Sequence, residues 1–523
     1  MKYLKFTLLF FLLSSFTKAQ IPTIQWQKSF GGSNNETAKS IVQTLEGGYI
    51  TAGYSKSSDG NATTNHGDND FWVVKMDASG TFQWQKSLGG SGDDQANSIC
   101  TTSDGGYVVV GFTNSSNGDV TLNKGSSDYW IVKLDALGNI VWQKTYGGQA
   151  QDIATSVKKT TDGGYIVTGY SSSSNGDITG NHGQNTTDYW VVKLDPLGNL
   201  QWQKSLGGAS NERAFEIQQT NDGGYIVAGD TYSSNSGDVS STASGSGRDF
   251  WIVKLGSTGN IIWEKRFGGS GEENAYSIDQ TSDSGYIVSG TTTSTNGNIS
   301  FNNGQGDYWI IKLDALGNLQ WEKALGSVTY DQAYSVKQTP DGNYVATGYL
   351  SSNTGVAESE PLASTQYWVV KLDTLGNLLW HRSYGGSGNE AAYSIISTSD
   401  GGLAVAGSSN TNPDSGDVTG NHGQLDFWIL KLTGSKELGT MENNTPEKPI
   451  LYPNPAKDLV NIDNLPSETT INITDASGRK ISSKKYSGKN VSMNTSGLIN
   501  GNYIIQVEHQ GITILNKKII ISK

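Results

Sequence analysis

The chain has 523 residues, a formal net charge of −12, 66 glycines and one cysteine. This acidic balance makes nucleic acid an improbable partner, because it repels phosphate backbones. The lone Cys100 excludes an internal disulfide, and an aromatic content of 10% argues against a low-complexity chain.

The N-terminus has the pattern of a secretory signal peptide. Lys2 and Lys5 precede an apolar run from Phe6 to Leu13, and the segment ends in Thr17-Lys18-Ala19. We therefore predict a signal peptide over residues 1–19 and export from the cytoplasm. No later segment approaches 18 apolar residues, so we expect no transmembrane segment.

The tryptophans mark a repeat. Seven of them follow a period of 58 to 61 residues, at Trp26, Trp84, Trp142, Trp202, Trp263, Trp321 and Trp380. The other seven mark a second place in the same unit, at Trp72, Trp130, Trp190, Trp251, Trp309, Trp368 and Trp428. The chain is thus an array of one unit, and the fixed places of the tryptophans predict packing within and between units.

Four strands fit one period, at Ala154–Val157, Gly164–Gly169, Tyr189–Leu194 and Leu200–Leu206. A turn such as Asp162-Gly163-Gly164 precedes the second strand, and a short glycine-containing turn joins the third to the fourth. Four antiparallel strands at this spacing are typical of a propeller blade.

The two ends of the array predict closure of a ring. The mature chain begins with a lone fourth strand, Ile24–Phe30, and the array ends with a lone third strand, Phe427–Leu432. Together they complete one blade, which leaves no unpaired ring edge. We predict an all-β, seven-bladed β-propeller over residues 20–433, with repeats of about 60 residues. An open β-solenoid is the alternative.

A second domain follows a polar segment without periodicity. Residues 434–449 are predicted to be a linker, and residues 450–523 a small Ig-like β-sandwich. The sign of the charge changes in this domain: residues 448–523 carry a net charge of +5, whereas the whole chain carries −12. Its strands are expected at Val460–Ile462, Thr470–Thr474, Tyr503–Glu508 and Lys518–Ser522.

Several ordered motifs lie in this domain. They are Tyr452-Pro453-Asn454-Pro455, Asp475 with Gly478-Arg479, Leu498-Ile499-Asn500-Gly501-Asn502-Tyr503, and Lys517-Lys518-Ile519-Ile520. In this order they resemble the type A C-terminal sorting domain of the Bacteroidetes type IX secretion system. The resemblance implies an export address read by the outer-membrane translocon, and a final location outside the cell or at its surface. The repeats also resemble those found ahead of such domains, which implies no activity.

An acidic residue precedes almost every third strand, at Asp70, Asp128, Asp188, Asp249, Asp307 and Asp426, with Gln366 as the exception. We expect these side chains to bond backbone amides of the preceding loop. Calcium ligation is the alternative, because the loops are rich in oxygen donors, although they lack the spacing of a known calcium loop. We predict no cofactor, with Ca²⁺ left open.

Histidines give no metal-binding pattern. His66, His182 and His422 share one loop context but belong to different repeats, so we expect exposed turn histidines. No zinc motif, phosphate loop or Ser-His-Asp pattern is present.

Paired carboxylates are the remaining catalytic candidates. In Asp93-Asp94 and Glu272-Glu273 the adjacent side chains of a strand point to opposite faces, which makes poor acid and base pairs. Glu358 and Glu360 lie in a loop that departs from the repeat. No catalytic residue is assigned.

Loops that depart from the repeat are the best candidates for binding, since a rigid scaffold places function in its loops. The two loops are Asp230–Arg248 and Gly355–Thr365. The candidate binding residues are Asp230, Tyr232, Arg248, Tyr330, Glu358 and Glu360.

The leading hypothesis is therefore a secreted or surface-located, non-catalytic binding or adhesion protein that recognises glycan or protein. The competing class is a polysaccharide hydrolase. A structural surface protein without a small ligand is a third reading.

Overall fold

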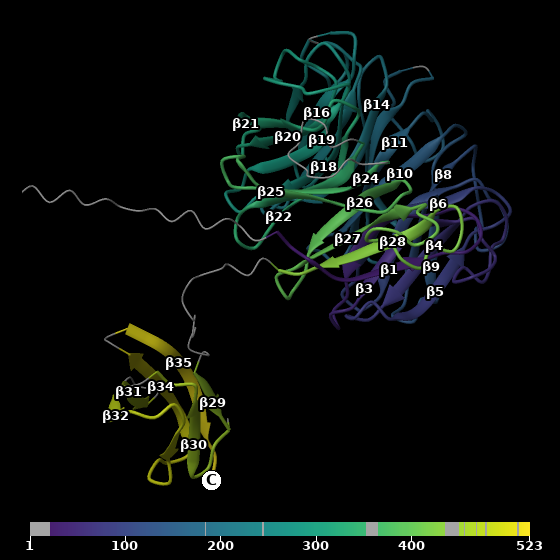
Figure 1. The fold of residues 1–523 in the computed structure, drawn as a ribbon. Helices are drawn as coiled ribbons and strands as arrows, with labels where there is room; N and C mark the ends of the chain where they lie inside the picture. The colour runs from purple at the N-terminus through teal and green to yellow at the C-terminus, as the bar shows by residue number, and fades with distance from the viewer. Residues whose placement is uncertain are drawn as a thin grey trace, which may run out of the picture. The chain divides into compact units, whose positions relative to one another are not determined.

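Strands make up all the regular secondary structure that the computed structural model describes (Figure 1). The described residues are 21–183, 185–242, 245–351, 364–434, 449–453, 455–466, 468–475, 479–509 and 512–523. The chain divides into an N-terminal unit, Met1–Glu437, and a C-terminal unit, Leu438–Lys523. No helix among the described residues is long and apolar enough to cross a membrane.

Over its described residues the N-terminal unit contains seven four-stranded antiparallel sheets. Each has a first, second, third and fourth strand. The first strands are β2 (Glu36–Gln43), β6 (Asp94–Thr101), β10 (Asp152–Lys159), β14 (Glu212–Gln219), β18 (Glu273–Gln280), β22 (Gln332–Gln338) and β26 (Glu390–Ser397). The second strands are β3 (Tyr49–Ser55), β7 (Tyr107–Thr113), β11 (Tyr165–Ser171), β15 (Tyr225–Thr231), β19 (Tyr286–Thr292), β23 (Tyr344–Leu350) and β27 (Leu403–Ser409).

The third strands are the most buried. They are β4 (Asp70–Met76), β8 (Asp128–Leu134), β12 (Asp188–Leu194), β16 (Asp249–Leu255), β20 (Asp307–Leu313), β24 (Gln366–Leu372) and β28 (Asp426–Leu432). The fourth strands are β1 (Ile24–Phe30), β5 (Phe82–Leu88), β9 (Ile140–Tyr146), β13 (Leu200–Leu206), β17 (Ile261–Phe267), β21 (Leu319–Leu325) and β25 (Leu378–Tyr384). The fourth strand Leu200–Leu206 was predicted to the residue, while the first strand extends beyond Ala154–Val157 at both ends.

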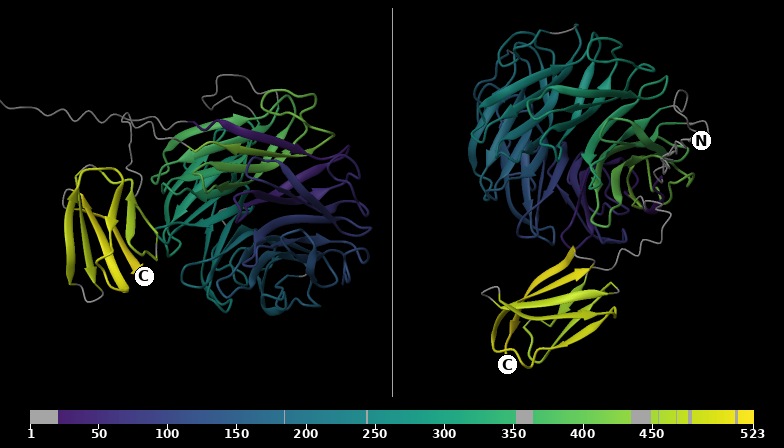
Figure 2. Two further views of the ribbon diagram at one scale, coloured as in Figure 1. Left: turned by 90° about the horizontal axis from the view of Figure 1, so that it is seen from below. Right: turned by 90° about the vertical axis from the view of Figure 1, so that its left-hand side faces the viewer.

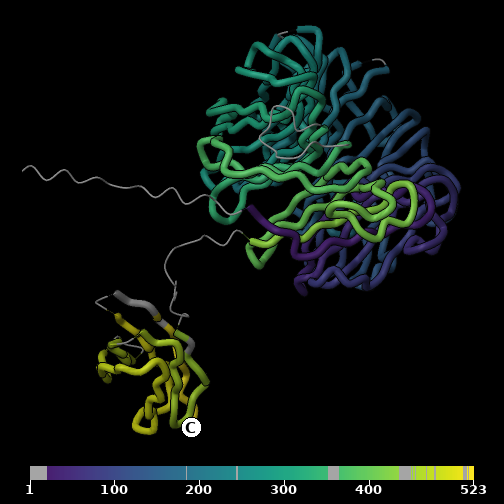
Figure 3. Tube along the Cα trace, viewed as in Figure 1, coloured from purple at the N-terminus to yellow at the C-terminus, as the bar shows by residue number. Residues whose placement is uncertain are grey.

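One sheet joins the two ends of the repeat array. Its order is β1-β28-β27-β26, so the first strand of the chain pairs antiparallel with the last strand of the array. The purple N-terminal segment therefore lies beside a light green segment in Figure 3. The first strands are also neighbours in sequence order from β2 to β26, and β26 contacts β2.

Tryptophans fill the space between neighbouring sheets, as their fixed spacing predicted. Each third-strand indole is at most 1% exposed and packs at a tilted or edge-on angle against an aromatic ring of a neighbouring sheet. In the part of the chain described, the pairs are Phe71–Trp130, Tyr129–Trp190, Tyr189–Trp251, Phe250–Trp309, Tyr308–Trp368, Tyr367–Trp428 and Phe427–Trp72, with ring centroids 4.4 to 4.7 Å apart. Such pairs add to apolar burial through ring quadrupoles, so this layer holds sheet to sheet.

The C-terminal unit has two sheets over its described residues (Figure 2). One has the order β29-β30-β33 and the other β32-β31-β34-β35. Their bounds are β29 (Ile450–Tyr452), β30 (Leu459–Asp463), β31 (Thr469–Asp475), β32 (Lys480–Tyr486), β33 (Val491–Asn494), β34 (Gly501–His509) and β35 (Ile512–Ile521). Val460, Ile471 and Ile505 lie in one core cluster, so apolar residues of both sheets pack together. β29, β32 and β33 were not predicted from the sequence.

Candidate functional site

Each first strand carries a β-bulge, which changes the direction of the side chains that follow it. In β2 the pairing with β3 shifts between Ala38 and Ser40, and the same shift occurs in the other described first strands. A bulge places an extra residue in one strand and breaks the alternation of faces. Ala38 and Ile41 are therefore both buried in a core cluster, while Lys39, Ser40 and Val42 line a cavity.

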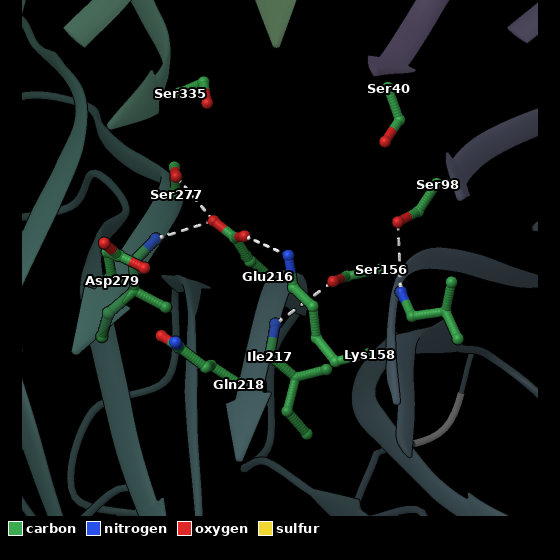
Figure 4. A network of polar contacts seen from close by, with 12 residues as sticks. Ser40, Ser98, Ser156, Lys158, Glu216, Ile217, Gln218, Ser277, Asp279 and Ser335 are labelled. Atoms are coloured by element: carbon green, nitrogen blue, oxygen red, sulfur yellow. Dashed lines mark hydrogen bonds and ion pairs between the residues drawn. The ribbon is translucent and has the colours of Figure 1, made fainter. Parts of the chain in front are cut away.

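The fifth residue of each first strand, or the fourth in the shorter β22, takes part in a belt of hydrogen bonds. A serine oxygen accepts from a backbone amide of the next first strand, as in Ile99 N to Ser40 Oγ at 3.3 Å and Val157 N to Ser98 Oγ at 3.2 Å. The belt returns to its start, since Ile41 N donates to Ser394 Oγ at 3.3 Å. Glu216 takes the serine's place in β14 and accepts from Ile278 N at 2.9 Å (Figure 4).

Glu216 is also the centre of a charged layer, which we define as Lys158, Glu216, Asp279 and Lys337. Figure 4 shows the first three of these residues. Glu216 Oε1 lies 2.8 Å from Lys158 Nζ and 3.1 Å from Lys337 Nζ. The two ammonium groups hold the pKa of Glu216 well below its usual range against the cost of burial. Glu216 in turn raises the pKa of Lys337. These charges satisfy one another, so the layer is structural.

Above this layer, toward the beginning of the first strands, lies a hollow that we call the aromatic hollow. Its volume is about 380 Å³, and its lining includes Lys39, Asn97, Thr155, Phe215, Tyr276, Tyr334 and Tyr393. All seven stand directly before the belt residue of a first strand, a place that we call the fourth position, although in β22, which begins one residue later, it is the third residue. The aromatic rings follow one another, with centroid distances of 4.9 Å, 5.1 Å and 4.8 Å from Phe215 to Tyr393.

A cluster of ion pairs lies beside the hollow. We call it the arginine cluster, and it consists of Arg213, Asp230, Tyr232, Arg248 and Glu272. Arg213 Nη2 donates to Asp230 Oδ2 at 2.9 Å, and Arg248 Nε lies 3.7 Å from Glu272 Oε2. The Arg248 guanidinium lies 4.7 Å from the ring centroid of Tyr232, whose hydroxyl donates to Glu272 at 3.1 Å. Burial raises the pKa of Asp230 even though Arg213 opposes this.

The arginine cluster borders the aromatic hollow through β14 and its neighbours. The Arg213 guanidinium lies 5.5 Å from the ring centroid of Phe215, which lines the hollow. Its Nη2 also donates to Asn274 at 3.3 Å, two residues before Tyr276 on β18. The two features therefore share one end of the N-terminal unit.

Three sequence-predicted site residues, Asp230, Tyr232 and Arg248, are thus brought together. Tyr330 is close enough for the charges of Glu272 and Arg248 to act on its pKa, which burial raises. Glu358 and Glu360 lie outside the described residues. Arg213, Glu272 and the hollow were not predicted as site residues.

Adjacent carboxylates do face apart, as expected for strands. Glu273 is buried and accepts from Gly269 N at 2.8 Å, whereas Glu272 belongs to the arginine cluster. Asp94 likewise accepts from Gly90 N at 2.8 Å, whereas Asp93 accepts from Asn69 Nδ2. A buried carboxylate that accepts the amide four residues earlier recurs in the other described repeats, which makes it part of the architecture.

The acid before the third strand bonds backbone amides of its loop, as the sequence predicted. His66 N donates to Asp70 at 2.9 Å and Lys124 N to Asp128 at 2.6 Å. His66, His182 and His422 each place Nδ1 2.7 to 2.9 Å from this acid in their own loop. Among the described residues, no group of three or more His, Cys, Asp or Glu side chains could hold a metal ion.

Residues 450–522 match the family described as secretion system C-terminal sorting domain. The chain is accordingly a type IX secretion cargo with a C-terminal sorting domain. Such a domain implies export to the cell surface or the extracellular space.

Two curated proteins are similar to part of this chain at low sequence identity. Regulatory protein FlaEY of Caulobacter vibrioides is 24% identical over 37% of this chain and 22% of its own length. An uncharacterized WD repeat-containing protein of Acanthamoeba polyphaga mimivirus is 22% identical over 53% of this chain and 26% of its own. The chain therefore spans about a quarter of the length of the curated relatives it matches.

Solved structures with a similar fold share little sequence. PorZ of Porphyromonas gingivalis, a surface component of the type IX secretion system, has a TM-score of 0.37 and 12% identity, covering 94% of this chain and 60% of that one. The Pan2 WD40 domain of Neurospora crassa has a TM-score of 0.43 and 10% identity, covering 75% and 88%. A Dyadobacter fermentans protein of unknown function has a TM-score of 0.40 and 11% identity, covering 79% and 99%.

Proposed function

We propose that the chain is an exported, non-catalytic binding protein that recognises glycan at the end of the N-terminal unit where the first strands begin. The observation that carries this proposal is the aromatic hollow beside the arginine cluster. Partly buried aromatic rings next to hydrogen-bonding side chains suit sugar rings, which offer both C–H faces and hydroxyl groups. A protein ligand is the alternative occupant of the same end.

The architecture we propose is a seven-bladed β-propeller over residues 20–433, closed by strands from both ends. Three features support closure: the pairing of β1 with β28, the serine belt that returns from β26 to β2, and the Phe427–Trp72 ring pair. Residues 434–449 would be a linker, and residues 450–523 an Ig-like sandwich. Residues 1–19 would be a signal peptide, so that the chain crosses the inner membrane before type IX export.

Recognition fits the arginine cluster better than hydrolysis does. A glycosidase needs one carboxyl group that can donate a proton and one that can attack or activate water. Both Asp230 oxygens face Arg213, with Nε to Oδ1 at 3.4 Å and Nη2 to Oδ2 at 2.9 Å. Because both oxygens of Asp230 already accept hydrogen bonds from the Arg213 guanidinium, the Asp230 carboxylate is poorly placed to transfer protons to a substrate.

The test incubates the purified chain with a panel of polysaccharides and records retention and new reducing ends together. We expect retention without new reducing ends. Arg248→Ala should weaken retention, whereas Thr187→Ala, at the equivalent place before β12, should not. New reducing ends that vanish in Asp230→Asn and Glu272→Gln would replace binding by hydrolysis. No retention of any glycan would favour a protein ligand or a purely structural surface role.

A further inference from the structure

Lys39 differs from the two lysines of the charged layer, because no carboxylate pairs with it among the described residues. Lys158 and Lys337 both contact Glu216. The Lys39 ammonium instead lies 3.8 Å from the ring centroid of Tyr393 and 6.0 Å from that of Tyr54. Burial lowers its pKa to about 8. A desolvated cation without an anion nearby is costly, and an anionic ligand would offset that cost.

The aromatic residues around Lys39 indicate a second property of the ligand, a ring that can stack on them. Lys39 stands at the end of the aromatic series, next to Tyr393, and Tyr334 and Tyr276 continue the series around the hollow. Asn97 and Thr155 line the same hollow. A ring stacked on Tyr334 or Tyr393 would thus bring one substituent toward the Lys39 ammonium.

We propose that the aromatic hollow is a subsite for a sugar bearing a carboxylate, such as a uronic acid, with Lys39 binding the carboxylate and the tyrosines stacking on the ring. This inference rests on the proposed glycan binding and names its ligand class. The chain as a whole has a net charge of −12, which disfavours long polyanions. A single acidic residue in a saccharide fits this local positive charge better than a highly charged polymer does.

Lys39→Met removes the charge and keeps an unbranched side chain of similar length. Glucuronate and glucose are suitable probes, since they differ at one carbon, and saturation-transfer NMR on the whole chain measures both at concentrations of about 10 mM. We expect glucuronate to bind roughly tenfold more tightly than glucose, which is what one charge-assisted hydrogen bond supplies. Lys39→Met should abolish this preference, and Lys39→Arg should keep it. Lys28→Met removes a charge from β1 as the matched control.

A second arm uses pH. The preference for glucuronate should fall as pH rises through about 8 in the wild type and persist in Lys39→Arg, because arginine stays charged. Tyr54 and Tyr393 are the titratable groups that face Lys39, and burial raises the pKa of Tyr393 to about 12, so Tyr393 stays neutral in this range.

The outcomes separate the inference from the proposed function. Equal binding of glucose and glucuronate, unchanged in Lys39→Met, would overturn the carboxylate subsite and leave glycan binding intact. Tyr334→Leu should weaken both sugars alike if the ring stacks there. Absence of glucuronate binding in a chain that still retains a neutral polysaccharide would also overturn the inference. Acetate binding as tightly as glucuronate would show that the hollow recognises the anion without the sugar.

Discussion

Replacing Asp128 with Asn should stabilise the N-terminal unit at neutral and alkaline pH. Asp128 is 0% exposed, and its Oδ1 has no hydrogen-bond partner among the described residues. Burial, together with the nearby carboxylate of Asp152, raises the pKa of this carboxyl group to about 6, although the bond from Lys124 N opposes the shift. Its other oxygen accepts from Lys124 N at 2.6 Å, a bond that the Asn carbonyl can keep.

The sign of the pH effect follows from this raised pKa. The neutral carboxyl group is favoured in the folded chain, so its contribution is fully present below about pH 4 and is lost as pH rises through about 6. A difference of about 2 pKa units between the folded and unfolded chain corresponds to a free energy of unfolding of nearly 3 kcal/mol. Solvent screening of this partly buried group reduces the figure to about 2 kcal/mol. The sheet formed by β22 to β25 already carries the neutral Gln366 at this place.

Urea denaturation followed by tryptophan fluorescence measures the effect in the whole chain. All 14 tryptophans lie between Trp26 and Trp428, so the signal reports on the N-terminal unit alone. Asp128→Asn should raise the free energy of unfolding by about 2 kcal/mol at pH 8 and by little at pH 4. In thermal melts the same gain amounts to roughly 2 °C, since the unfolding entropy of a unit of roughly 400 residues is large.

Asp249→Asn is the contrasting control at the equivalent place. Asp249 pairs with Arg266, whose side chain is 3% exposed, so its loss leaves a buried cation unpaired. That change should cost about 3–5 kcal/mol. Parallel pH curves for wild type and Asp128→Asn, or a loss of stability at pH 8, would refute the reasoning.

Three further outcomes can be measured with the same chain. Gly138→Ala should destabilise by about 1–3 kcal/mol more than Gly105→Ala, because both glycines have φ of +80° but only at Gly138 would a Cβ meet Trp84, at 2.9 Å; equal losses would show that the contact relaxes freely. Glu216→Ser restores the residue of the other repeats yet should cost about 3–5 kcal/mol at pH 7, because Lys158 and Lys337 lose their anion. The cost should shrink at acidic pH, since the low pKa of Glu216 means that its stabilisation is lost as pH falls; a cost independent of pH would contradict the ion-pair account. Deleting residues 450–523 should leave the tryptophan unfolding curve unchanged and prevent export from the native host; undiminished amounts outside the cell would contradict the role of the sorting domain.

Local patterns were sufficient to predict the strands of the repeats. Each repeat carries two turn motifs that mark strand ends, one before the second strand and one between the third and fourth strands. The short glycine-containing turn predicted between third and fourth strands is present, and its Gly138 has φ of +80°, a conformation that favours glycine. The short strand β29 and the exposed strand β32 were missed because they have little apolar alternation. Both strands pair with the adjacent strand in the sequence, β30 and β31, so the reason for the miss is their composition and not a long-range pairing.

The bulge of the first strands left a signal that period-two reasoning passes over. Ala38 and Ile41 are both buried although three residues separate them, and the same spacing recurs as Ala214 with Ile217 and as Ala333 with Val336. Regular alternation would place such residues on opposite faces. A conserved spacing of three within a strand of each repeat therefore indicates an irregularity, and with it the residues that share a face.

The arginine cluster could be predicted only in part, because its residues come from different elements. Asp230 and Arg248 bracket one unusual loop, which made them candidates, whereas Arg213 and Glu272 lie at ordinary places in their repeats. The sequence does not state which positions of different repeats converge. That depends on the packing of first strands against one another.

The repeat also explains why function should be sought at the fourth position of the first strands. The buried acid, the core alanine and the serine of these strands each have a repeated bonding or packing role, so substitutions there disturb the link to the next sheet. The fourth position has no bond common to all repeats: Asn97 and Thr155 donate to a backbone carbonyl of the next first strand, whereas Lys39 and the aromatic residues make ring contacts. Variation at a site that packing does not constrain can be selected for a ligand. The aromatic side chains belong to the first strands of four neighbouring sheets, β14, β18, β22 and β26. The last of them, Tyr393, lies beside Lys39, the one lysine among the described residues that line the hollow. The cation and the end of the aromatic series lie side by side, with the Lys39 ammonium 3.8 Å from the ring centroid of Tyr393, which is why we assign both to one ligand.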